Sequence, residues 1–352
     1  MTMLAFPSLL AESSVPYPVV YRRVIMSCPP RNEFQIGWIC ALAVEVAAAK
    51  EMLDERFGPL DGQDPTDPNA YTLGRVGKHN IVIACLPEGQ YGTSSANTVA
   101  NHLTRTFSKS LRVGLMVGVG GGIPSSANDV RLGDIVISRP VGTDGGVVQY
   151  DMGKRVAGGV FSRTGSLNSP PRSLLAAIAQ LKADQLTDEP KFVEYVQSAT
   201  ERTSRTKKLF RHPGSKSDRL FQAEYDHPAN ESSCDACPSE LEVIREIRDD
   251  DLPWTHYGLI ASGNSVIKDG RTREKLGAEI GALCFEMEAA GLMLDFPCIV
   301  IRGICDYSDS HKNKQWQGYA ALVAASYAKE LLEYLAPSHI TQEQLAADVC
   351  RE

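Results

Sequence analysis

The chain has 352 residues, a length that allows two domains or one large α/β domain. Hydrophobic residues make up 43% and charged residues 22%, the ordinary balance of a soluble globular protein. The net charge of −7 argues against a protein that binds nucleic acid, because such proteins gather Lys and Arg to neutralise phosphates. No apolar run approaches the ~20 residues that span a bilayer, so no membrane protein is expected. After these exclusions, small anionic or neutral molecules remain as candidate ligands.

The N-terminus and the cysteines both favour a cytoplasmic protein. Residues 1–33 are rich in proline, show no helical or alternating period and are predicted to be an extension, ordered only where it docks on the body. No positively charged segment precedes their short apolar stretch, so a secretory signal is not expected. The nine cysteines are an odd number, and most lie in or beside apolar stretches, as small buried hydrophobes in a reducing compartment do.

Strand-like and helix-like patterns alternate along the chain from residue 34 onwards. Residues 34–41 are a short apolar run suited to a buried strand, and from Ala43 a helical spacing continues until Gly58-Pro59. Further strands are predicted at 71–76, 81–86, 113–119, 134–138, 257–262 and 298–304, and helices at 93–107, 173–181 and 314–335. This alternation indicates an α/β sheet whose ligand sites lie at the carboxyl ends of strands.

Two segments depart from this alternation. Residues 184–240 are polar, contain a basic stretch between Arg202 and Arg211, and have few apolar anchors. They are predicted to form a partly mobile insertion that lies over a site. Residues 336–352 are predicted to be a tail with a short polar helix at most, so the body of the domain spans 34–335.

A glycine-rich run, Gly118-Val119-Gly120-Gly121-Gly122-Ile123, invites comparison with dinucleotide-binding loops. The third glycine of that fingerprint would fall on Ile123, and Pro124 follows where a helix should begin, so the fingerprint does not match. No Gly-Lys-Ser/Thr follows either, which excludes a P-loop. A tight turn is the commoner role of such a run. The alternative is close approach of the backbone to a ligand, since residues without Cβ let a ring or sugar lie against the main chain.

Cys234 and Cys237 form a C-x-x-C pair inside the insertion. A zinc site needs two more ligands, and only His212 and His227 lie near in the sequence. The histidines are otherwise scattered, with neither an H-E-x-x-H pattern nor a Ser-His-Asp arrangement. We therefore predict no metal and no cofactor.

Acidic residues at the ends of predicted strands are more informative about chemistry than the cysteines and histidines are. Asp306 follows the last predicted strand, which is itself interrupted by Arg302. Glu286 and Glu288 flank a methionine at the predicted start of a helix, where the helix dipole favours carboxylates. Their apolar neighbours suit buried groups better than solvated ones, and a buried carboxylate needs partners such as the hydroxyls of a ligand. Glu45 lies in the first turn of the first predicted helix.

Six short motifs, in this order, resemble those of the nucleoside phosphorylase-I superfamily. They are residues 36–46, the glycine run, Leu132-Gly133-Asp134-Ile135-Val136, Ser262-Gly263-Asn264, residues 285–290 and residues 302–306. The likeness is strongest to methylthioadenosine/S-adenosylhomocysteine nucleosidases and to the nucleoside phosphorylase-like proteins of fungi, which often form the N-terminal domain of NLR-like immune or incompatibility proteins. It implies a single-domain mixed, twisted central sheet wrapped by helices, usually assembled as a homodimer or larger homo-oligomer.

The resemblance also assigns roles to residues of this chain. The family's water-activating glutamate falls on Glu45, its purine-protonating aspartate on Asp306, and its ribose-binding Met-Glu pair on Met287 and Glu288. Further residues expected to contact substrate are Gly121, Asn264, Val266, Ile267 and Phe285. The implied activity is that of a purine nucleosidase, which hydrolyses the N-glycosidic bond to free base and ribose. Adenosine is the first choice of substrate, because an aspartate at the base suits a 6-amino purine.

Two alternatives to a purine nucleosidase remain open. A phosphate-dependent phosphorylase would need the arginine and serine that the superfamily's phosphorylases place around the glycine run, and the matching positions here are Met116 and Val119. Hydrolysis is therefore expected over phosphorolysis. A non-catalytic nucleoside-sensing or oligomerisation module is the second alternative. However, a relative that has lost catalytic activity usually also loses its catalytic carboxylates, and this chain keeps Glu45, Glu288 and Asp306.

Overall fold

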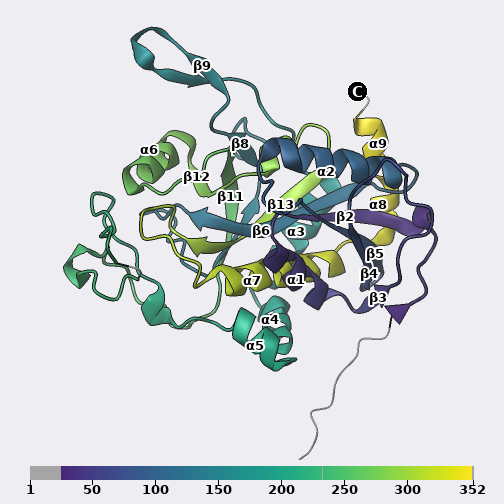
Figure 1. Cartoon of the computed structure of the whole chain (residues 1–352), viewed down its shortest axis with the longest axis horizontal. Coiled ribbons are helices and arrows are strands. Elements are labelled where there is room, and N and C mark those ends of the chain that lie inside the picture. Colours follow the sequence, from purple (N-terminus) through teal and green to yellow (C-terminus); the bar gives the residue numbers. More distant parts are fainter. Residues whose placement is uncertain (1–24, 232, 351–352) are drawn as a thin grey trace, which may run out of the picture.

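A mixed β-sheet forms the centre of the molecule, and helices cover both of its faces (Figure 1). The computed structural model describes residues 25–231 and 233–350. Of the predicted extension at 1–33, residues 1–24 therefore lie outside the described residues. Its last part includes a short strand, β1 (Ile25–Met26), which pairs in parallel with β3 (Glu55–Phe57) at the edge of the sheet.

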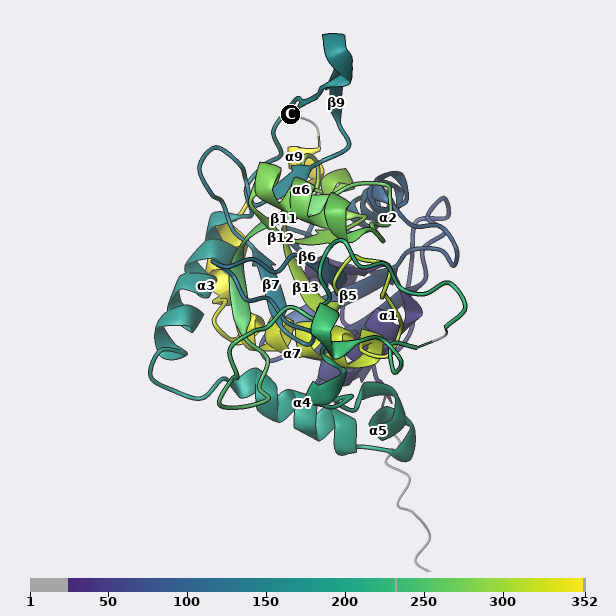
Figure 2. The same cartoon turned by 90° about the vertical axis from the view of Figure 1, so that its left-hand side faces the viewer.

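Eleven strands of the described chain share this sheet, and two form a separate hairpin. Besides β1 and β3, the sheet contains β2 (Phe34–Cys40), β4 (Tyr71–Val76), β5 (His79–Cys85), β6 (Val113–Gly122), β7 (Ile135–Ser138), β8 (Val147–Gln149), β11 (Thr255–Ser262), β12 (Ala282–Glu286) and β13 (Cys298–Asp306). The hairpin consists of β9 (Gly153–Arg155) and β10 (Phe161–Arg163), and it projects from the body in Figure 2. Strands β6, β12, β11, β7 and β13 close into a ring, because β13 pairs with both β7 and β6.

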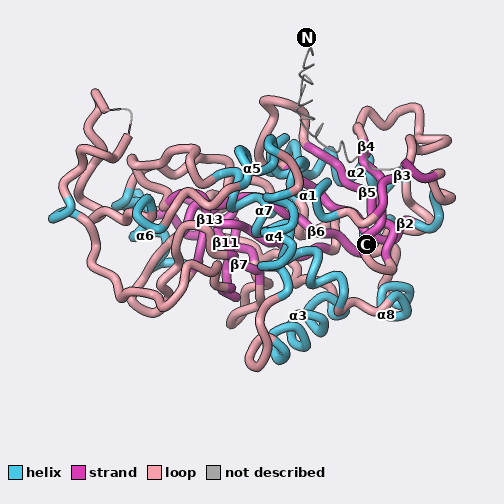
Figure 3. The backbone as a smooth tube through the Cα atoms, turned by 90° about the horizontal axis from the view of Figure 1, so that it is seen from below, coloured by secondary structure: helices cyan, strands magenta, loops and turns pink. Residues whose placement is uncertain are grey.

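Helices lie on the two faces of the sheet in unequal numbers. They are α1 (Ala43–Met52), α2 (Thr93–Thr106), α3 (Arg172–Asp184), α4 (Lys191–Glu201), α5 (Ser204–Phe210), α6 (Gly270–Ile280), α7 (Gln317–Glu333), α8 (Pro337–Gln342) and α9 (Ala346–Val349). One core contains buried residues of α1, α3, α4 and α7, whose helices appear together in the view from below (Figure 3). The other core contains α2 and α9. Within the described residues, no helix is both long enough and apolar enough to span a bilayer.

The central strands divide their side chains between the two cores with the period of two that a strand imposes. In β13, Ile299 and Ile301 face the α7 side, whereas Cys298, Val300 and Ile304 face the α2 side. Because helices cover both faces of the sheet, the sequences of these strands are continuous apolar runs and do not alternate between apolar and polar residues.

Several predicted elements agree closely with the structure. The strands predicted at 34–41, 71–76 and 81–86 correspond to β2, β4 and β5 within two residues at each end, and the helix predicted at 93–107 corresponds to α2. The helix from Ala43, however, ends at Met52 and does not run to Gly58, because the chain turns there into β3, which pairs with β4.

Two further predictions near the expected site are wrong. The glycine run does not form a tight turn: Gly118, Gly120, Gly121 and Gly122 continue β6 as a buried strand. The chain at Phe285 and the following glutamate does not begin a helix but ends β12, which pairs antiparallel with β6. In both cases the local pattern was ambiguous, and pairing with a distant strand decides the structure.

The insertion is more tightly anchored than its composition indicated. Its helices α4 and α5 pack against α7 through the buried residues Phe192, Ala199 and Phe210. Leu220 and Phe221 are also buried farther along the segment. Each of these elements has only one or two apolar anchors among many polar residues, so the segment looked mobile in the sequence.

The tail also docks on the body. In place of a single short polar helix, it forms α8 and α9, each with one fully buried residue, Ile340 and Ala346. The amide of Ala346 donates to the Leu111 carbonyl oxygen at 2.8 Å, and Glu343 accepts a hydrogen bond from the Ser173 amide at 2.9 Å.

Gly303 on β13 lies so close to α7 that a side chain there would collide with the helix backbone. A Cβ added at Gly303 would overlap the carbonyl oxygen of Ala320. We expect Gly303→Ala to lower the free energy of unfolding by about 1–3 kcal/mol, the usual cost of overpacking, in urea unfolding followed by circular dichroism. Gly58→Ala is the matched control, since the nearest atom to its added Cβ is 3.8 Å away. Equal losses in both variants would contradict close packing at Gly303.

Candidate active site

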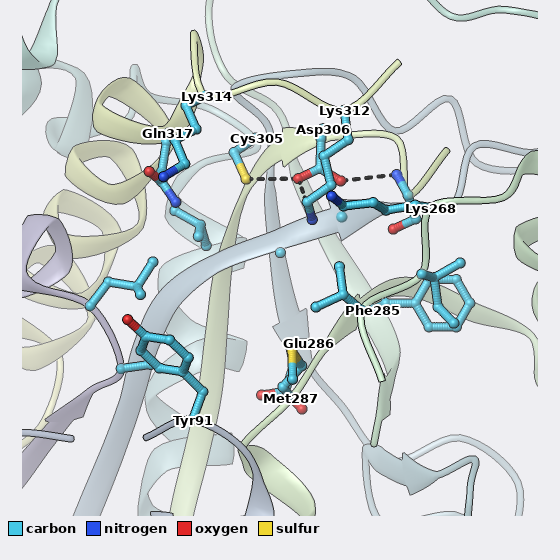
Figure 4. Close-up of a pocket in the computed structure, with 18 of the residues that line it drawn as sticks. Tyr91, Lys268, Phe285, Glu286, Met287, Cys305, Asp306, Lys312, Lys314 and Gln317 are labelled. Carbon is cyan, nitrogen blue, oxygen red and sulfur yellow. Dashed lines mark hydrogen bonds and ion pairs between the residues drawn. The ribbon is translucent and has the colours of Figure 1, made fainter. Parts of the chain in front are cut away.

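A pocket of about 280 Å³ lies at the carboxyl ends of β2, β12 and β13, beside the first turn of α1. Its volume is near the lower end of the ~300–1,000 Å³ typical of small-molecule sites. The structure brings eight of the nine predicted site residues to its wall: Glu45, Gly121, Val266, Ile267, Phe285, Met287, Glu288 and Asp306. Figure 4 shows Asp306 at one end of the pocket and Met287 at the other, with Tyr91 and Phe285 on its two sides.

A buried arginine organises the end of the pocket near Met287. Arg302, on β13, is 1% exposed, and its Nη2 forms an ion pair with Glu286 and lies 3.6 Å from Glu288 Oε2. Its Nη1 lies close to Glu45, because a Cβ added at Gly118 would touch both groups. The buried charged groups occupy the space that a side chain at position 118 would need, so the position requires glycine. The sequence showed Arg302 only as an interruption of an apolar strand.

Glu45 is held by three backbone amides. It is the third residue of α1, where its Oε2 accepts hydrogen bonds from the amides of Ala41 at 2.7 Å and Leu42 at 2.9 Å. Its Oε1 accepts from the amide of Val119, on β6, at 2.8 Å. Burial raises the pKa of Glu45, and Arg302 and the three amides act in the opposite direction. A fixed, buried carboxyl with a raised pKa is suited to accept a proton from a water.

The two glutamates around Met287 have different environments. Glu286 Oε2 accepts hydrogen bonds from the amides of Glu288 at 3.0 Å and Ala289 at 2.9 Å, besides its ion pair with Arg302. Glu286 therefore shapes the turn after β12. Among the described residues, the amide of Gly92 alone donates to Glu288 Oε1, at a long 3.3 Å, which leaves lone pairs for a ligand.

Asp306 ends β13 and is held from three directions. Its Oδ1 accepts from the amide of Ser308 at 2.9 Å, and its Oδ2 lies 3.2 Å from Cys305 Sγ and 2.8 Å from Lys312 Nζ (Figure 4). Burial acts to lower the pKa of Lys312, but Asp306 and neighbouring groups together raise it, so the ammonium form persists. Lys312 was missed in the sequence, because only the fold of the following loop returns it to Asp306.

The glycine run forms the wall between the two ends of the pocket. Gly121 pairs with Asp306 on one side and with Phe285 on the other. A Cβ at Gly121 would lie 2.8 Å from Asp306 Oδ1 and would overlap the hydroxyl of Ser308. The backbone of Gly121 is thus approached closely by protein side chains, and approach of a ligand to the glycine run stays a prediction.

Asn264 is the predicted site residue that does not line the pocket. Its Oδ1 accepts hydrogen bonds from the amide and hydroxyl of Thr93 at 3.1 and 3.0 Å, and its own amide donates to Asp151 at 2.8 Å. Asn264 therefore positions the start of α2, next to the Gly92 amide that faces Glu288.

The chain belongs to the phosphorylase superfamily, which residues 35–336 match. That superfamily contains nucleoside phosphorylases and nucleosidases. A nucleotide-binding leucine-rich repeat (NLR)-like protein of Hyaloscypha variabilis is 49% identical over 314 residues, which are 89% of this chain and 30% of that protein. A 5′-methylthioadenosine/S-adenosylhomocysteine nucleosidase of Mycobacterium tuberculosis is 32% identical over 88 residues, 24% of this chain and 34% of that protein. The chain thus spans about a third of the length of these relatives.

Solved structures confirm the expected fold, a mixed central sheet wrapped by helices. The 5′-methylthioadenosine/S-adenosylhomocysteine nucleosidase of S. pneumoniae, with a transition-state inhibitor, has a TM-score of 0.54 at 17% identity, covering 86% of this chain and 100% of that chain. The futalosine hydrolase of Helicobacter pylori has a TM-score of 0.53 at 17% identity, covering 86% and 98%. The sequence resemblance to the nucleoside phosphorylase-I superfamily is also confirmed.

The unusual environment of Glu288 makes protein stability depend on pH. Burial raises its pKa to about 7; Arg302 opposes this rise, whereas Glu286 and Glu45 add to it. The same carboxyl titrates near 4.5 when it is solvated. The folded protein therefore holds a proton that the unfolded chain has lost, and stability falls as the pH rises between about 4.5 and 7.

We expect Glu288→Gln, which is neutral at every pH, to gain stability relative to the wild type as the pH is raised from 5 to 8. Urea unfolding at four pH values in this range measures the difference. Glu88→Gln, at an exposed position, is the control and should show no such trend. A pH-independent difference for Glu288→Gln would show that this carboxyl does not titrate in the folded protein in this range.

Proposed function

We propose that this protein is a purine nucleosidase that hydrolyses the N-glycosidic bond of adenosine or a related purine nucleoside. The observation that supports this most directly is the opposite character of the two ends of the pocket. Buried glutamates surround Met287, whereas an aspartate paired with a lysine lies at the other end. Cleavage of a nucleoside separates charge in the same sense, because the sugar becomes positive and the departing base becomes negative.

The base end would assist departure of the purine. As the bond from the sugar C1′ to the purine nitrogen breaks, its electron pair moves into the base, and a proton delivered to N7 neutralises that charge. Asp306 and Lys312, joined at 2.8 Å, hold a transferable proton at this point. General-acid assistance of this kind is worth about 10²–10⁴ in rate.

The sugar end would bind the ribose and activate water. Glu288 would accept hydrogen bonds from the 2′- and 3′-hydroxyls and keep negative charge beside the developing cation. Glu45 would take a proton from a water as its oxygen attacks C1′, on the face opposite the departing base. Two carboxylates on opposite sides of the reacting bond are the arrangement of inverting glycosidases.

Charge at the sugar end supports water over phosphate as the nucleophile. Arg302 offers one positive charge to three carboxyl groups, Glu45, Glu286 and Glu288. A phosphate dianion would enter a region that already carries excess negative charge. The lysines that line the pocket, Lys268, Lys312 and Lys314, gather near Asp306 at the other end (Figure 4).

The first test is release of free base from adenosine by the purified protein, in phosphate-free buffer and again with added phosphate. Adenine and free ribose without phosphate are the expected products. Release only with phosphate, giving ribose 1-phosphate, would identify a phosphorylase. No release from adenosine, inosine, guanosine or methylthioadenosine would favour a nucleoside-sensing or oligomerisation module.

Asp306→Asn distinguishes an enzyme from a binding module. We expect it to lower kcat for adenine release by about 10²-fold or more, because the amide cannot pass on a proton. Asp188→Asn, at an exposed aspartate, should retain full activity. Normal turnover by Asp306→Asn would contradict the proposed mechanism, and a change in nucleoside affinity alone would indicate a binding role.

Lys312→Met tests whether the ammonium beside Asp306 participates. We expect kcat to fall by about 10-fold or more, at the weaker end of general-acid effects, because Asp306 itself remains. KM should change less than kcat if Lys312 acts on the leaving base. Lys78→Met, in the turn between β4 and β5, is the control. An unchanged kcat in Lys312→Met would leave proton delivery to Asp306 alone.

A further inference from the structure

The insertion folds back onto the loop that follows Asp306. The amide of His227 donates a hydrogen bond to Ser310 Oγ at 2.9 Å, and Cys234 Sγ lies 3.9 Å from the carbonyl oxygen of His311. Phe221 stacks on the His311 ring with a centroid separation of 4.1 Å. This part of the insertion therefore packs directly against the segment that carries Lys312.

Three side chains with metal-binding atoms converge at this contact. The ligand atoms of His227, Cys234 and Cys237 all lie within 4.8 Å of one another. Zinc prefers thiolate and imidazole ligands, and structural zinc sites commonly take two cysteines from a C-x₂₋₄-C turn. The Cys237 amide donates to the Cys234 carbonyl oxygen at 3.0 Å, so the chain between them forms such a turn.

We propose that His227, Cys234 and Cys237 bind a zinc ion, with His311 as the fourth ligand, and that this ion fastens the insertion to the loop after Asp306. The sequence alone did not support a metal, because His311 is 74 residues from Cys237 and no spacing rule connects them. The fold brings the two segments together.

His311 is the second, independent observation. Its residue is 8% exposed, yet neither ring nitrogen has a hydrogen-bond partner among the described residues. Asp309 Oδ1 lies 3.7 Å from Nδ1, beyond hydrogen-bond distance. The His311 ring lies 5.3 Å from the His227 ring, centroid to centroid. Buried imidazole nitrogens without partners are costly, and coordination of an ion at the neighbouring cluster would satisfy one of them.

The surroundings of the cluster also suit bound thiolates. Arg219 donates to the carbonyl oxygens of both cysteines, with its Nη2 2.8 Å from that of Cys237. Its positive charge offsets part of the negative charge that two thiolates bring. Nε2 of His227 lies 3.1 Å from the Ser233 carbonyl oxygen, the kind of backbone partner that fixes the ring of a metal-bound histidine.

Metal content tests the proposal without reference to catalysis. The full chain is purified without a chelator and without a metal-charged affinity resin. Elemental mass spectrometry should then find about one zinc ion per chain. Cys234→Ser with Cys237→Ser should remove it, and Cys350→Ser, at an exposed cysteine outside the cluster, should retain it. Absence of zinc from the wild type, even after dialysis against Zn²⁺, or retention by the double variant, would overturn the proposal.

Substitution of the histidine separates loss of a ligand from loss of the fold. His227→Cys keeps a ligand and should retain zinc, whereas His227→Asn should lose it; His339→Asn, at an exposed histidine, is the control. Zinc retained equally by His227→Asn and the control would remove His227 from the site. Co²⁺ added to the metal-free wild type should give the intense visible absorption of tetrahedral thiolate coordination, and octahedral Co²⁺ spectra would contradict the ligand set.

His311→Ala tests the fourth ligand, and thiol titration tests the competing state of the cysteine pair. We expect His311→Ala to weaken zinc retention in a chelator competition by about 10-fold or more, and unchanged retention would exclude His311.

Cys234 and Cys237 should react as free thiols only after zinc is removed. Their failure to react in metal-free, unreduced protein would identify a disulfide and overturn the zinc site.

Discussion

Burial of one arginine charge is the constraint on which the site depends. Arg302 lies on β13 between β6 and β7 and is 1% exposed, so an unpaired charge there would cost several kcal/mol. Glu286 pairs with it, and Glu288 and Glu45 lie close. The glycine at 118 leaves room for this group, and Glu286 fixes the turn in which Met287 and Glu288 lie. Removal of the arginine would leave three buried carboxyl groups without a counter-charge.

The pair of Arg302 and Glu286 leaves the other two glutamates incompletely compensated. Burial raises the pKa of both Glu45 and Glu288, and the neighbouring Glu45 raises the pKa of Glu288 further. Proteins accept such strain at functional sites, where a ligand relieves it. Ribose hydroxyls and a developing positive charge at C1′ are the groups that would do so here. The same excess of carboxylates would favour the transition state of the N-glycoside cleavage that we propose.

The sequence predicted the groups of the site better than it predicted their pairing. Glu288 was recognisable because a carboxylate among apolar residues needs partners. Glu45 and Asp306 were recognisable by their places, at a helix start and a strand end, and by the family resemblance. Lys312, the partner of Asp306, was not recognisable, because it follows in a polar loop without a distinctive sequence pattern. The strand β12 was missed because its fifth residue, Glu286, is the first of two glutamates that imitate the start of a helix. In each case a contact between distant parts of the chain outweighs the local pattern, as tertiary context commonly does.

The geometry of the glycine strand relates the two ends of the pocket to each other. A Cβ added at Gly118 would meet the Glu45 and Arg302 side chains, and one added at Gly121 would meet Asp306. Three residues of extended chain span roughly 10 Å, so β6 meets these two groups of side chains at separate points along its length. Inverting glycosidases place their two carboxyl groups about 6.5–9.5 Å apart, to admit a water between them. A purine requires somewhat more, because its acceptor N7 lies beyond the nitrogen that bonds the sugar. Strand β6 therefore borders both ends of the pocket, and in the proposed reaction it would fix the place of Glu45 relative to Asp306.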